Sequence, residues 1–274
     1  MMLLAVDIGN TSIAFGMFER NKLNSSRKIS TQGIFSNKTI SLPDKVDAAI
    51  ISSVVPKATP IIKKAIAKRY KIRPLVLGDN IKAPIKNLYR KPKQVGQDRL
   101  VDAVAVKELY GCPSIVIDFG TAITFDVISK KGEYLGGLIF PGIETSLNAL
   151  SQKAALLPKI KVAPPKGLIG RDTVDSMRSG VFYGTGALCD GVIAKLKSKY
   201  GPMKVIATSV RSSNSMTRNS TIGRSPEIPY PHKLFKLRVL ICINLAAGRK
   251  DGSLYNKRLA KSWNNCASSG RVRK

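Results

Sequence analysis

Two stretches of the chain, separated by about the length of a domain, share one pattern: an apolar strand, an acid–x–glycine turn and a second apolar strand. The first reads "LLAVDIGNTSIAFGMF" (3–18) and the second reads "SIVIDFGTAITFDVI" (114–128). Each turn carries an acid, a glycine and a threonine, which are Asp7, Gly9 and Thr11 in the first and Asp118, Gly120 and Thr121 in the second. Such a repeat indicates a duplicated domain, so we expect two similar lobes.

Short apolar strands alternate with amphipathic helices around these two stretches. The pattern predicts strands over 48–55, 73–78 and 205–208, and helices over 59–71, 96–111, 143–157 and 173–200. Alternation of this kind is typical of an α/β architecture. We therefore predict an α/β fold with an N-terminal lobe over 1–113 and a C-terminal lobe over 114–208.

Composition excludes several classes of function. The chain has 46 Lys and Arg against 17 Asp and Glu, but the basic residues are scattered without interleaved aromatic residues, so nucleic acid is not favoured as a partner. A single histidine and four widely spaced cysteines argue against a zinc site and for free thiols. No apolar run approaches the ~20 residues of a membrane span and nothing resembles a signal peptide, so we expect a cytoplasmic protein.

The two acid–glycine turns are suited to a phosphate ligand. Glycine lets the backbone approach a ligand closely, while turn amides and hydroxyl groups donate to phosphate oxygens. An aspartate beside a polyphosphate would hold a metal ion or its waters. A single Gly-Asn turn is equally typical of a plain hairpin. Because acid, glycine and threonine all recur in the second copy, the pair favours two turns that bind one nucleotide.

Two further motifs have both a structural and a functional interpretation. In "VGQDRL" (95–100), Asp98 is either a helix N-cap or the group that takes a proton from an attacking hydroxyl, with Arg99 pairing with a substrate anion. In "GRDTVDS" (170–176), Thr173 is either a capping or first-turn threonine or a substrate contact. One base, charge neutralisation and positioning suffice for phosphoryl transfer.

Together, the motifs resemble those of type III pantothenate kinases. They occur in the same order, "DIGNTS", "GQDR", "DFGTAITFD", "GGLIFPG" and "IGRDT…SGVFYG", and the resemblance covers residues 2–208. It implies a homodimer of the acetate and sugar kinase/Hsc70/actin superfamily with two ribonuclease H-like lobes. The implied reaction is ATP-dependent phosphorylation of pantothenate to 4′-phosphopantothenate, the first step of coenzyme A synthesis.

The resemblance also implies a role for each matching residue. ATP would contact Asp7, Ile8, Gly9, Asn10, Thr11, Ser12, Ile13, Ala14 and Thr121. Pantothenate would contact Gly96, Gln97, Asp98, Arg99 and Thr173, with Asp98 as the proton acceptor. Asp118 would hold K⁺ or NH₄⁺, and Mg²⁺ would accompany ATP.

The pattern stops after Thr208. The resemblance implies a Gly-Gly turn there, but Ser209 and Val210 follow, and residues 209–274 form a basic tail without periodicity. We hypothesise that this tail is read out of frame, and sequencing codons 205–215 tests the hypothesis: an intact frame with no alternative that restores the turn would contradict it. Two alternatives to an active kinase follow, namely a nucleic-acid-binding transcriptional accessory protein and an inactive product of a damaged gene.

Overall fold

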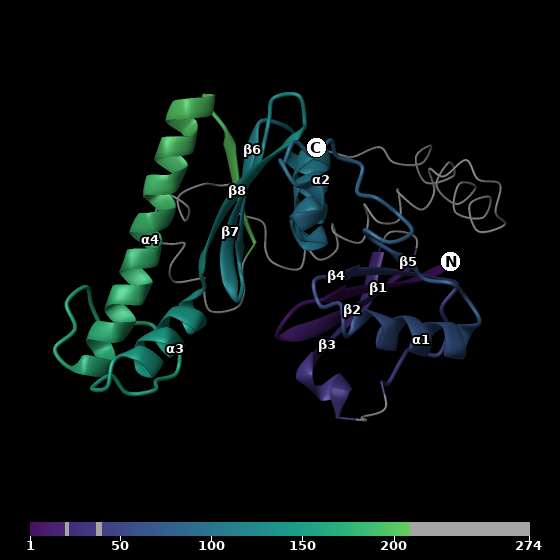
Figure 1. Cartoon of the computed structure of the whole chain (residues 1–274), viewed down its shortest axis with the longest axis horizontal. Helices are drawn as coiled ribbons and strands as arrows, with labels where there is room; N and C mark the ends of the chain where they lie inside the picture. Colours follow the sequence, from purple (N-terminus) through teal and green to yellow (C-terminus); the bar gives the residue numbers. More distant parts are fainter. Residues whose placement is uncertain (20–21, 37–39, 209–274) are drawn as a thin grey trace. The chain divides into compact units, whose positions relative to one another are not determined.

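The computed structural model describes residues 1–19, 22–36 and 40–208, so the predicted basic tail lies outside the described residues. The described chain packs as two compact units (Figure 1). The first contains Met1–Ile85 and Lys91–Ala105, and the second contains Lys86–Arg90 and the described residues from Val106 onward. The division falls inside helix α2 (Gln97–Tyr110). The lobe limits at 113 and 114 were inferred from the repeat rather than from packing, and they stay a prediction.

The first unit is built on a five-stranded sheet in the order β3-β2-β1-β4-β5. Its strands are β1 (Met2–Ile8), β2 (Ser12–Glu19), β3 (Lys22–Ser30), β4 (Ala48–Ser53) and β5 (Leu75–Val76). Strands β1, β2 and β3 form an antiparallel meander, while β4 runs parallel to β1 and to β5. The 3₁₀ turns η1 (Gln32–Phe35) and η2 (Pro92–Gln94) and helix α1 (Thr59–Tyr70) complete the unit.

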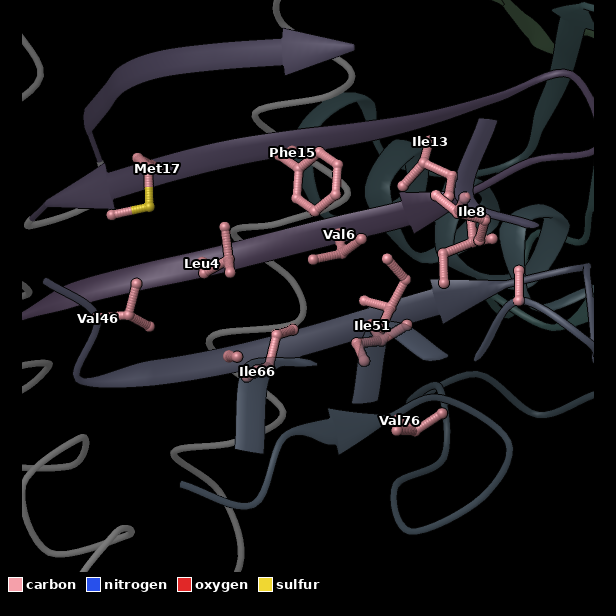
Figure 2. Close-up of a cluster of buried hydrophobic side chains, with 14 residues drawn as sticks. Leu4, Val6, Ile8, Ile13, Phe15, Met17, Val46, Ile51, Ile66 and Val76 are labelled. Carbon is pink, nitrogen blue, oxygen red and sulfur yellow. The ribbon is translucent and has the colours of Figure 1, made fainter. Parts of the chain in front are cut away.

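Both faces of this sheet are buried. One face packs against Ile62 and Ile66 of α1 and carries the cluster of Figure 2, in which the side chains of Leu4, Val6 and Ile8 line up along β1. The other face carries Leu3, Ala5 and Ile50 and packs against Val101 of α2. Each fully buried side chain of this size contributes about 1.5–3 kcal/mol to folding. The sheet therefore lies between α1 and α2, which places the start of α2 over one face of the sheet.

The second unit repeats the plan of the first. Strands β6 (Ser114–Phe119), β7 (Ala122–Ile128), β8 (Tyr134–Pro141) and β9 (Lys204–Thr208) form a sheet in the order β8-β7-β6-β9. As β1 pairs with β2 and β4, so β6 pairs antiparallel with β7 and parallel with β9. Helix α4 (Thr173–Tyr200) runs along this sheet (Figure 1), burying Cys189 and Ile193 against it, and α3 (Ile143–Lys153) packs beside α4. The two related sheets confirm the α/β fold that the repeat predicts.

Two elements differ from the sequence-based expectation. Strand β3 was not predicted, because its residues are mostly polar and exposed and it pairs only with β2 at the edge of the sheet. The helix predicted to Leu157 ends at Lys153, so Ala154 and Leu157 do not continue its face. The chain turns there, with the Leu157 N–H donating to the Ala154 carbonyl, and Pro158 could not have continued a helix. None of the helices in the described ranges combines the length and apolar character of a membrane span.

Candidate active site

The first acid–glycine turn joins β1 to β2 and is held from β3. Asp7 and Ile8 pair with Ala14 and Ile13, so the turn itself runs from 9 to 12, and the Gly9 N–H donates to the Ser12 carbonyl at 3.0 Å. The buried Thr31, at the end of β3, donates its hydroxyl to the Gly9 carbonyl at 2.6 Å and its N–H to the Thr11 carbonyl at 3.1 Å. Thr31 therefore holds both the first and the third residue of the turn.

The second acid–glycine turn is one residue shorter than the first. Asp118 pairs with Thr124 and Phe119 with Ile123, which leaves a turn of three residues over 120–122. The Gly120 N–H donates to the Ala122 carbonyl at 3.0 Å. Thr11 and Thr121 therefore occupy different positions in their turns, although both follow an acid and a glycine.

The start of helix α3 holds the second turn in place. The Thr121 carbonyl accepts hydrogen bonds from the Gly142 N–H at 2.9 Å and from the Thr145 hydroxyl at 2.7 Å. A Cβ atom on Gly142 would lie only 2.2 Å from the Gly120 carbonyl oxygen. This close approach explains the final glycine of "GGLIFPG".

Asp98 lies in the first turn of α2. The helix begins at Gln97, so Asp98 is one residue inside it and the N-cap interpretation is wrong. Its Oδ1 nevertheless accepts the Arg99 N–H at 2.8 Å, which stabilises the helix start. A Cβ atom on Gly96 would lie 2.5 Å from the same Oδ1, so the glycine leaves room for the carboxylate. The Arg99 side chain is buried, at 8% exposed.

Within the first unit, the GQDR segment lies at the same edge of the sheet as the first turn. The Val54 N–H, just beyond β4, donates to the Ile8 carbonyl at 3.0 Å, and a Cβ atom on Gly96 would lie 3.5 Å from Cγ1 of Val54. The Gln97 side chain lies against Gly78, which follows β5. This edge is where the parallel strands β1, β4 and β5 end, and ligands of open α/β sheets bind at such carboxyl ends.

Thr173 is the first residue of α4 and is exposed. The cap is the preceding residue, Asp172, whose carboxylate accepts the Asp175 N–H at 2.7 Å, so Thr173 is a first-turn threonine and not the cap. The loop before the helix is tied to it, because the Lys166 N–H donates to the Asp175 carboxylate at 3.2 Å and the Ser176 hydroxyl donates to the Gly170 carbonyl at 3.3 Å. The threonine hydroxyl is thus presented on a fixed helix start.

The predicted site residues divide between the units. The first unit contains the residues from Asp7 to Ala14 and from Gly96 to Arg99, and the second contains Asp118, Thr121 and Thr173. Three supporting residues were missed from the sequence: Thr31, Gly142 and Thr145. Their role depends on strand pairing and on the position of α3, and only the glycine of "GGLIFPG" offered a signal.

Each acid–glycine turn offers one carboxylate, Asp7 in the first unit and Asp118 in the second. Within the described ranges no three His, Cys, Asp or Glu side chains lie close enough to hold a metal ion. Mg²⁺ is typically bound by one or two carboxylates together with substrate phosphates. Cys112 and Cys189 are free thiols, and burial raises the pKa of Cys189 to about 12, which leaves it protonated at neutral pH. Cys242 and Cys266 lie outside the described residues.

Comparison with known sequences matches this chain to one family. The family model for type III pantothenate kinase matches residues 3–195. The type III pantothenate kinase of Myxococcus xanthus is 41% identical over 221 residues, covering 76% of this chain and 86% of that protein. That of Halalkalibacterium halodurans is 37% identical over 235 residues, covering 81% of this chain and 92% of that protein.

Solved structures share the fold at low sequence identity. A conserved putative Baf family transcriptional activator from Campylobacter jejuni is 20% identical with a TM-score of 0.51, covering 88% of this chain and 100% of that chain. A putative 2-dehydro-3-deoxygalactonokinase protein from Sinorhizobium meliloti is 12% identical with a TM-score of 0.57, covering 92% of this chain and 99% of that chain. At such identities the likeness concerns the fold alone.

Proposed function

The chain belongs to the type III pantothenate kinase family, and on that premise we propose that it transfers the γ-phosphoryl group of ATP to pantothenate, forming 4′-phosphopantothenate for coenzyme A synthesis. The observation that carries the proposal is the position of Asp98. Its carboxylate lies at the start of α2, beside the carboxyl ends of β1 and β4, where the first acid–glycine turn also lies.

Asp98 is the proton acceptor in this reaction. The pantothenate hydroxyl oxygen forms a bond to the γ-phosphorus, the bond from that phosphorus to the bridging oxygen breaks, ADP leaves and the hydroxyl proton passes to Asp98. The hydrogen bond from the Arg99 N–H orients the carboxylate for this role. General-base help of this kind contributes about 10²–10⁴-fold to the rate.

The other residues bind and position the substrates. The segment Asp7–Ala14 and Thr121 bind the ATP phosphates through turn amides and hydroxyl groups. Gly96–Arg99 and Thr173 bind pantothenate, and the Arg99 guanidinium pairs with its carboxylate. Asp7 would hold Mg²⁺ or its waters and Asp118 would hold K⁺ or NH₄⁺, which would neutralise the charge of the phosphates.

A direct test measures ADP release that depends on pantothenate. We expect turnover only when ATP, Mg²⁺ and pantothenate are all present, and a higher rate in K⁺ than in Na⁺ at equal ionic strength. ATP hydrolysis that does not respond to pantothenate would contradict the proposal. DNA binding with a steep salt dependence and no turnover would favour the accessory-protein alternative. A folded protein with neither activity would favour the inactive product.

We also propose that the protein is a cytoplasmic homodimer. All of the large apolar side chains that the described chain leaves exposed, apart from Phe35, belong to the second unit, including Leu156 at 93% and Ile169 at 82%. Gly180 and Gly184 lie one turn apart on α4, and no neighbouring element of the described chain lies within 4 Å of a Cβ built on either of them. In the proposed dimer some of these side chains are buried between the two copies, because burial of exposed apolar surface favours association.

Light scattering after gel filtration tests the oligomeric state. We expect a mass of twice the 29.7 kDa of one chain. Ile169→Asp should shift the protein towards the monomer, because it places a charge at an exposed apolar position of the proposed interface. A wild-type monomer at micromolar concentration would contradict the dimer without affecting the proposed reaction chemistry.

A further inference from the structure

One polar pair interrupts the apolar face of the first sheet beneath α2. Along β1, Leu3, Ala5 and Asp7 lie on this face, and their partners in the parallel strand β4 are Ala48, Ile50 and Ser52. The apolar members of both rows pack together with Val101 of α2. Residues in register on parallel strands direct their side chains to the same face. The apolar face therefore ends, at the carboxyl edge of the sheet, in Asp7 beside Ser52.

The Ser52 hydroxyl is buried and makes no hydrogen bond within the described part of the chain. The residue is 7% exposed, and its Oγ has no hydrogen-bond partner among the residues that the structure describes. A buried hydroxyl without a partner destabilises a protein, so most buried polar groups are hydrogen-bonded and an exception calls for an explanation such as a ligand. Nothing in the packing of this face requires serine, because the preceding positions in the same row are alanine and isoleucine.

The second unit has a hydroxyl residue at the corresponding position. In β6 and β9, which correspond to β1 and β4, Asp118 is in register with Thr208. Each lobe thus pairs the acid of its acid–glycine turn with a serine or threonine at the end of the parallel neighbouring strand. The backbone register of acid and neighbouring strand therefore recurs in both copies.

We propose that Ser52 is a further residue of the phosphoryl-donor site, donating a hydrogen bond to an oxygen of the MgATP assembly held beside Asp7. A carboxylate can bind a cation or its waters but cannot donate to a phosphate oxygen, whereas a serine hydroxyl can do so. The oxygen is either a phosphate oxygen or a water on the divalent ion. The inference rests on the proposed function, because it takes MgATP as the ligand.

The test compares Ser52→Ala with a matched control, Ser114→Ala. Ser114 is also buried and its Oγ also lacks a hydrogen-bond partner in the described chain, but it starts β6 and lies at the opposite end of its strand from Asp118. We expect Ser52→Ala to weaken MgATP binding in calorimetry by about tenfold or more, as for loss of a hydrogen bond to a charged group, without lowering the thermal midpoint. Ser114→Ala should leave both unchanged, and Ser52→Thr should bind MgATP nearly as wild type.

The same titration with ATP and EDTA identifies the oxygen. If Ser52→Ala weakens the binding of MgATP but not of metal-free ATP, Ser52 donates to a metal-bound water. If the substitution weakens the binding of both, Ser52 donates to a phosphate oxygen. If Ser52→Ala bound MgATP with wild-type affinity, the inference would be overturned. It would also be overturned if Ser52→Ala, Ser52→Thr and Ser114→Ala all lost MgATP affinity together with a lowered thermal midpoint. A folded wild-type protein that binds no MgATP would overturn the proposed function and this inference together, which distinguishes that result from a failure of Ser52 alone.

Discussion

Asp98→Asn is expected to lower kcat for pantothenate phosphorylation by about 10²–10⁴-fold, the usual contribution of a general base. Asparagine has the shape of aspartate but cannot accept the substrate proton at neutral pH. Its side-chain oxygen can still accept the Arg99 N–H that Oδ1 of Asp98 accepts at 2.8 Å. The helix start should therefore be retained, and the KM for each substrate should change much less than kcat. Steady-state ADP release and a thermal melt of both proteins measure these effects.

Asp44→Asn provides the matched control for this substitution. Asp44 also lies in the first unit, where its fully exposed carboxylate contacts Arg69 at 3.0 Å. Exposed ion pairs contribute about 0–1 kcal/mol, so this variant should keep both turnover and stability. Equal turnover in Asp98→Asn and wild type would exclude Asp98 as the proton acceptor. A large fall in the thermal midpoint of Asp98→Asn would instead assign the residue a mainly structural role.

Gly142→Ala is expected to destabilise the second unit and to impair ATP binding. The backbone of Gly142 has φ −68° and ψ 168°, which alanine adopts freely, so the effect is purely steric. The new methyl group would lie 2.2 Å from the Gly120 carbonyl oxygen and 2.7 Å from that of Thr121. Both are backbone atoms, so the second acid–glycine turn or the start of α3 must move. Overpacking of this kind typically costs about 1–3 kcal/mol.

The prediction for Gly142→Ala concerns both stability and the site. A denaturant titration should show a lower free energy of unfolding, and the KM for ATP should rise because Thr121 shifts with its turn. Gly186→Ala is the control, since no other element of residues 1–19, 22–36 and 40–208 lies within 4 Å of a Cβ at that position in α4. Alanine there should be neutral or should stabilise the helix by up to about 1 kcal/mol. Wild-type ATP affinity in Gly142→Ala would contradict a role for the second turn in nucleotide binding.

Local patterns predicted most of the fold. The helices at 59–71, 96–111 and 173–200 are observed within one residue of the expected limits, because apolar periodicity and a helix-ending residue such as Gly111 act over a few neighbouring positions. The repeat of the acid–glycine turn predicted two related sheets, which the pairing of β1 and β6 with their neighbours confirms. Strand β3 was missed because an exposed edge strand need not be apolar.

The sequence by itself determined the chemistry of this protein: two acid–glycine turns, the GQDR helix start and membership of a kinase family. Only the tertiary structure decided what holds that chemistry in place. Thr31 binds a turn 22 residues away, and Thr145 binds a turn 24 residues away. Ser52 meets Asp7 only through the register of two parallel strands. A strand pattern specifies which side chains share a face, but the pairing of distant strands depends on the burial of whole faces, which no local sequence signal records.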